Sequence, residues 1–72
     1  MTQSARLNPA KIDRAMAARG LDGETLAKLA ALDESTVSRA RRGKAVKPRT
    51  IEKLIAALQK APVIDGAEEL LA

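Results

Sequence analysis

The chain has 72 residues, 13 of them basic and 9 acidic, which gives a net charge of +4 and a length sufficient for one small domain. It contains no Cys, His, Phe, Trp or Tyr. The absence of Cys and His excludes disulfides, thiolate zinc sites, thiol nucleophiles and a histidine base. The absence of aromatic rings argues against base stacking as in single-strand and many RNA-binding proteins. We therefore expect a protein that is not an enzyme and that holds no metal or cofactor.

The sequence shows no sign of export or membrane insertion. No apolar run approaches the roughly 18 residues of a membrane span, and residues 1–6 contain no apolar signal core. We expect a cytoplasmic protein with no membrane partner.

Cap and stop residues divide the chain into helices. Asn, Asp and Pro favour the first residues of a helix, whereas Gly or a following Pro ends it. The start signals are Asn8, Pro9, Asp22, Asp33 and Pro48, and the stop signals are Gly20, Gly43 and Pro62. The expected helices span about 9–19, 23–30, 34–42 and 48–60, with a last short helical turn over 67–72.

Apolar side chains recur at helical spacing, and no stretch alternates as a strand does. The residues assigned to the core are Ile12, Met16, Leu26, Leu29, Leu32, Ile51, Leu54, Ile55 and Leu58, with Leu70 and Leu71 buried by the last turn. The predicted fold is an all-α bundle of five short helices. We expect a flexible N-terminal arm over residues 1–8 and a folded domain over residues 9–72.

The positive charge is concentrated in one stretch. Residues 34–53 carry seven basic and two acidic side chains, a net charge of +5, whereas residues 1–33 have +1 and residues 54–72 have −2. A contiguous basic stretch is typical of a protein that binds a polyanion. A solvated helix face is the alternative explanation for this excess.

The second and third expected helices are joined by a short connection, as in a helix-turn-helix unit. Close packing of such a pair needs a small residue, a turn residue four positions later and a branched apolar residue six positions after that. Here these residues are Ala27, Ala31 and Val37. The same spacing also arises by chance in Ala-rich chains.

Over residues 9–71 the chain resembles the lambda-repressor-like helix-turn-helix family, also called Cro- or XRE-type. The matching residues are Arg19-Gly20-Leu21-Asp22, Leu26-Ala27, Ser35-Thr36-Val37-Ser38-Arg39, Arg42-Gly43-Lys44, Pro48, Thr50, Ile51, Leu54, Leu58 and Glu68-Glu69-Leu70-Leu71. The resemblance implies a compact five-helix domain with its helix-turn-helix at the second and third helices. It implies a sequence-specific transcriptional regulator, a bacterial or phage repressor at the nucleoid, that inserts residues 34–42 into the major groove of double-stranded DNA.

Three positions depart from the pattern of that family. Gly is frequent where the chain has Ala31, and a left-handed Ala there costs about 1–2 kcal/mol. Gln, which helps to clamp a phosphate, is common where the chain has Gly23. A glutamate is common where the chain has Arg41, so the charge available to an ion pair at that position is reversed.

The resemblance and the helical wheel together place the outward face of the third helix against base edges. The expected base contacts are Ser35, Thr36, Ser38, Arg39 and Arg42. Arg39 is the best candidate for a bidentate contact with guanine. For Ser35 and Ser38 the alternative is the hydrogen bonding that is common at helix starts.

Other polar residues flank this face and are expected to contact phosphates. They are Thr25, Arg41, Lys44, Lys47 and Arg49. Arg41 lies nearer to the Val37 side of its helix, so we expect it to meet a phosphate or Glu34 rather than a base. Arg6, in the arm, could reach the DNA backbone or a minor groove, although a single Arg in a flexible arm is more often solvated.

An antitoxin or adaptor that uses the same fold to bind a protein is the alternative function, with Leu70 and Leu71 as its apolar contact. We expect a monomer in isolation, because too few apolar residues remain outside the core for an interface of about 800 Å² per partner. Dimerisation on DNA, or through a segment absent from this chain, stays open.

Overall fold

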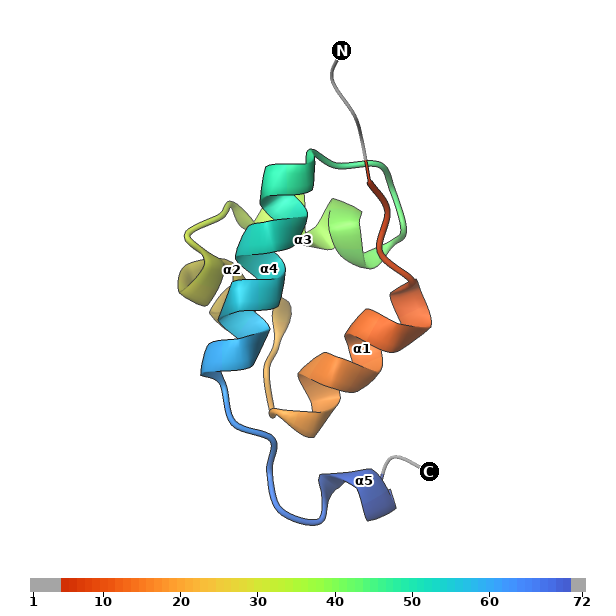
Figure 1. Cartoon of the computed structure of the whole chain (residues 1–72), viewed down its shortest axis with the longest axis vertical. Helices are drawn as coiled ribbons and strands as arrows, with labels where there is room; N and C mark the ends of the chain where they lie inside the picture. Colours follow the sequence, from red (N-terminus) through yellow and green to blue (C-terminus); the bar gives the residue numbers. More distant parts are fainter. Residues whose placement is uncertain (1–4, 71–72) are drawn as a thin grey trace.

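The computed structural model describes residues 5–70 (Figure 1). Its helices are α1 (Pro9–Ala18), α2 (Gly23–Ala30), α3 (Glu34–Arg41) and α4 (Pro48–Lys60), followed by the short α5 (Ala67–Leu70). The all-α fold and the four longer helices are confirmed, and the described range contains no strand. The five-helix bundle is not confirmed as predicted, because α5 has only four residues and residues 71 and 72 lie outside the described range.

Two of the predicted N-caps form their hydrogen bonds. Oδ1 of Asn8 accepts from the backbone N–H of Lys11 at 3.1 Å, and Oδ1 of Asp22 accepts from that of Thr25 at 2.7 Å. The bond from the Thr25 backbone lowers the pKa of Asp22 below its ordinary value of 3.8, because it stabilises the carboxylate. Asp33 has the extended backbone of an N-cap, but the prediction of a side-chain cap is wrong because its carboxylate makes no such bond.

Each of the four longer helices contributes one large, fully buried side chain to the core. These side chains are Met16, Leu26, Val37 and Leu54. Alanines between them are buried as well, and their small size lets the helix axes approach closely. In Figure 1, α4 crosses in front of α2 and α3, and α1 lies to one side.

Two predicted core residues are exposed instead. Leu29 is 42% exposed and Ile55 is 46% exposed. Leu26, Ala27 and Ala30 fill the inward face of α2, which turns Leu29 outward. In α4 the buried residues are Leu54 and Ala57, and Ile55 lies about 100° around the helix from Leu54. Three other predicted core residues are only half-buried: Leu32, Ile51 and Leu58.

Arg19 fastens the end of α4 to the end of α1. Its Nε donates to the backbone carbonyls of Leu58 at 2.8 Å and Ala61 at 3.1 Å. A cation at this place suits the negative end of the α4 dipole and satisfies carbonyls that lack a helical partner. The backbone N–H of Ile64 then donates to the carbonyl of Ala18 at 2.8 Å, which ties the following segment to α1.

The N-terminal segment lies along the loop between α3 and α4 (Figure 1). Ala5 and Val46 form an isolated antiparallel bridge. Leu7 packs against the core. Residues 5–8 of the predicted arm therefore have defined contacts, and residues 1–4 lie outside the described range.

Candidate nucleic-acid interface

The turn between α2 and α3 depends on Ala31. Its φ of 57° and ψ of 45° are left-handed, and it is the only residue other than glycine with a positive φ in the described part of the chain. The backbone N–H of Leu32 donates to the carbonyl of Ala27 at 2.9 Å and closes the end of α2. Ala27 is 2% exposed and Val37 is 1% exposed, so the small and branched residues of the predicted motif both lie in the core.

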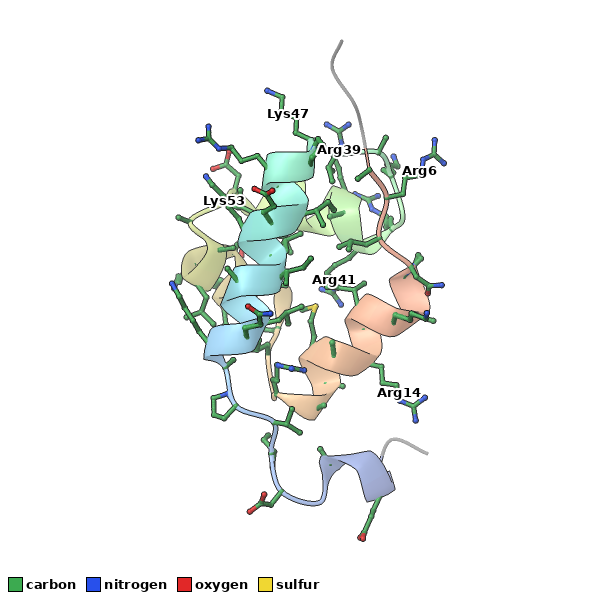
Figure 2. The ribbon with its side chains drawn as sticks, viewed as in Figure 1. Arg6, Arg14, Arg39, Arg41, Lys47 and Lys53 are labelled. Atoms are coloured by element: carbon green, nitrogen blue, oxygen red, sulfur yellow. The ribbon has the colours of Figure 1, made fainter. Side chains whose placement is uncertain are left out.

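The inward side of α3 consists of Val37 and Ala40, and its outward side is polar. The residues predicted to contact bases are exposed except for the half-buried Thr36: Ser35, Ser38, Arg39 and Arg42. The side chain of Arg39 makes no hydrogen bond or ion pair with any residue from 5 to 70. Figure 2 shows it at the same end of the molecule as Lys47 and Arg6.

Arg42 lies back along its own helix. Its Nη2 donates to Oγ of Ser38 at 3.1 Å, and its Nε donates to the Ser38 carbonyl at 3.3 Å. Both residues are exposed, so this contact can be exchanged for a ligand at small cost.

Three cations follow α3 in the chain, and all are exposed: Lys44, Lys47 and Arg49. None of them forms an ion pair with another described residue. Lys47 occupies the N-cap position of α4 without a side-chain cap bond. Thr25 is also exposed, in the first turn of α2, but its backbone N–H is bonded to Asp22.

Arg41 has a different environment from the other predicted contacts. Its Nη2 and Nε both lie 3.4 Å from Oδ1 of Asp13 in α1. Its Nη1 lies 3.1 Å from the point where a Cβ on Gly23 would stand. The Arg41 side chain therefore bridges three helices (Figure 2). The predicted contact with Glu34 is wrong, because that residue lies two helical turns away at the other end of α3.

Sequence reasoning missed Asp13 and the reason for Gly23. The available signal was the coincidence of two departures from the family pattern, a missing side chain at position 23 and a long cation at position 41. Considered together, these departures indicate that the missing side chain at Gly23 makes room for the guanidinium of Arg41.

An open hollow of about 180 Å³ lies beside the Arg41 ion pair. It is lined by Asp13, Ser38, Arg41 and Arg42. Within the described range, no group of three carboxylate, His or Cys side chains could hold a metal ion. None of the helices there has the length and apolar composition needed to cross a bilayer.

Comparison with known proteins agrees with this geometry. The family model for the Cro/C1-type HTH DNA-binding domain matches residues 11–62, which include all of α2, α3 and α4. No curated protein and no solved structure matches the chain. With more than half of its length matched and its helix-turn-helix formed, the chain belongs to the family of Cro/C1-type helix-turn-helix DNA-binding domains.

Proposed function

We propose that the protein is a sequence-specific transcriptional regulator, a bacterial or phage repressor, that inserts α3 into the major groove of double-stranded DNA. One observation carries this proposal. Of the seven basic residues in 34–53, only Arg41 forms an ion pair with another described residue. Exposed cations without an acidic partner in the described residues support a polyanionic ligand, because no ion pair there neutralises their charge.

The outward side chains of α3 suit base readout. The proposed base contacts are Ser35, Thr36, Ser38, Arg39 and Arg42. Their hydroxyls and guanidinium groups match the donors and acceptors of base edges in the major groove. The proposed phosphate contacts surround them on α2, α3, the next loop and α4: Thr25, Arg41, Lys44, Lys47 and Arg49. A regulator of this kind acts in the cytoplasm, at the nucleoid.

Selection from a pool of random duplex DNA tests this function directly. The expected result is a consensus of a few base pairs that is enriched at about 0.15 M salt, where non-specific binding is weak. A pool that is retained without enrichment would contradict sequence specificity. A pool that is not retained at any salt concentration would contradict DNA binding itself.

Binding of a protein partner, as in an antitoxin or adaptor, is the second candidate. The predicted apolar contact of such a protein consists of Leu70 and Leu71, and the side chains of these two residues lie outside the described part of the structure. The observation in its favour is a set of large hydrophobic residues that are about half exposed: Leu29, Ile55, Val63 and Ile64. A failed DNA selection, together with loss of partner binding when these residues are replaced by Ser, would favour this function.

A further inference from the structure

We infer that the N-terminal segment belongs to the DNA-binding surface, and that the bridge between Ala5 and Val46 holds Arg6 in place to bind a backbone phosphate. The inference rests on the proposed function and adds a contact to it. The segment that carries the contact has a defined path, whereas the sequence predicts a flexible arm there.

The bridge fixes the backbone of this segment at Ala5 through two hydrogen bonds. The N–H of Ala5 donates to the carbonyl of Val46 at 2.8 Å, and the N–H of Val46 donates to the carbonyl of Ala5 at 2.9 Å. Two residues that exchange both backbone hydrogen bonds form a hydrogen-bonded pair of the kind found in antiparallel sheets. Farther along, a Cβ on Gly43 would stand 3.1 Å from Cγ of Pro9, so the chain is close to the loop there as well.

The direction of the Arg6 side chain follows from the pairing of Ala5 and from the burial on either side of Arg6. Successive side chains of a chain that pairs as a strand point to opposite sides. Ala5 and Leu7 are half-buried, and Leu7 packs against the core, so Arg6 between them points outward and is exposed. Figure 2 shows Arg6 at the end of the molecule that also carries Arg39 and Lys47. Arg6 has no ion-pair partner among the described residues.

Charge and order together make Arg6 a phosphate contact rather than a solvated side chain. Arg6 follows the residue that pairs with Val46, so it lies beside the loop that carries Lys44 and Lys47, and these charges together attract a phosphate. The bridge has already ordered the backbone, so binding restricts only the side chain. A free arm would lose backbone freedom as well.

The first test measures binding to a random-sequence duplex by fluorescence anisotropy between about 50 and 200 mM salt. Arg6→Ala is expected to lower the slope of log K against log salt by about 0.9, which is about an eightfold loss of affinity at 0.1 M salt. The matched control is Lys60→Ala, which removes the same charge from the far end of α4 and should leave the slope unchanged. Equal slopes for both variants would overturn the inference.

The second test concerns the bridge. Ala5→Pro removes the N–H that bonds Val46, because proline has no backbone donor. We expect Ala5→Pro to weaken binding at least twofold when Arg6 is present, and to have no effect in the Arg6→Ala background. Losses that simply add in the double variant would overturn the role of the bridge.

Hydrogen exchange checks the bridge without DNA. The Val46 N–H should exchange slowly in the wild type and faster in Ala5→Pro, and equal exchange in the two proteins would count against the bridge. The tests also separate this inference from the proposed function. A wild type that shows no salt-dependent binding to duplex DNA contradicts the function. A wild type that binds, with Arg6→Ala behaving like Lys60→Ala, contradicts the inference alone.

Discussion

Arg41 of α3 is ion-paired with Asp13 of α1, with Nη2 and Oδ1 3.4 Å apart. The two side chains are 37% and 57% exposed, so the pair contributes only about 0–1 kcal/mol to folding. Its effect is one of placement, because it holds the guanidinium against Gly23, the first residue of α2. The resemblance to the lambda-repressor-like family implies a phosphate-clamping Gln at position 23, and in this chain the guanidinium of Arg41 lies beside that position.

We predict opposite effects on DNA affinity for the two partners of this pair. Arg41→Ala should lower the salt slope of binding by about 0.9, because one phosphate contact is lost. Asp13→Asn should tighten binding to every duplex, because it removes a negative charge that competes with phosphate for Arg41. Anisotropy titrations check both, with Asp65→Asn as a control that removes an acid from an exposed position far along the chain. A melting temperature lowered in both variants, with unchanged salt slopes, would indicate a purely structural pair.

Replacement of Arg39 should change the sequence specificity of DNA binding, whereas replacement of Lys44 should change the affinity for all DNA sequences. Arg39→Ala is expected to relax specificity at one base pair, at a cost of about 1–3 kcal/mol on the preferred site. Lys44→Ala is expected to weaken binding equally on all sequences and to reduce the salt slope by about one. Competition between the selected site and random DNA measures both. If the Arg39 variant lost the same affinity on both DNAs, its assignment to base readout would be wrong.

The helix limits are predictable from the sequence because their signals are local. Asn8 and Asp22 bond to N–H groups three residues ahead, and Gly20 and Gly43 have the positive φ that ends a helix. The set of apolar residues that face inward is harder to predict from local sequence signals. Ile55 fits the helical period of α4 and is nevertheless exposed, because Ala57, a small residue that carries little weight in the pattern, marks the buried side instead.

The exposed polar and basic surface around α3 was predictable from the sequence, but the contacts of its side chains were not. The basic stretch and the polar side of α3 follow from spacing and charge alone. The pairing of Arg41 with Asp13 and the bridge of Ala5 with Val46 join residues 28 and 41 positions apart. Such contacts depend on how the helices pack, and no pattern within a single helix contains that information.

Ala31→Gly should stabilise the domain. A left-handed alanine costs about 1–2 kcal/mol, and glycine avoids this cost but loses about 0.5–1 kcal/mol through greater freedom of the unfolded chain. The expected net gain is about 0.5–1 kcal/mol, or a few degrees in melting temperature for a domain of this size. Ala17→Gly, at an exposed helical position in α1, is the matched control and should destabilise by about 0.5–1 kcal/mol. A lower melting temperature for Ala31→Gly would contradict the left-handed turn.

Asp22 should make a small part of the stability depend on acid pH. Its folded pKa is depressed below 3.8 by the hydrogen bond from the Thr25 backbone, so its contribution is present above pH 3.8 and is lost as the pH falls through the folded value. Asp22→Asn keeps a capping oxygen that does not titrate. The advantage of the wild type over this variant in melting temperature should therefore shrink at low pH. Asp33→Asn is the control, since Asp33 makes no cap bond, and a similar pH trend for both variants would contradict the prediction.

The domain is predicted to be a monomer in solution. Ile55 is exposed and is not part of the core, so four large hydrophobic side chains are available to a partner: Leu29, Ile55, Val63 and Ile64. They come from α2, α4 and the segment before α5, and each is only about half exposed. Such a set falls short of the about 800 Å² per partner that a standard interface buries. The net charge of +4 adds repulsion between two copies at low salt.

Sedimentation equilibrium at high micromolar concentration should give the monomer mass at both low and high salt. A dimer that dissociates when Ile55→Ser is introduced would contradict the prediction and locate the interface on α4, whereas a dimer insensitive to it would point to the C-terminal residues.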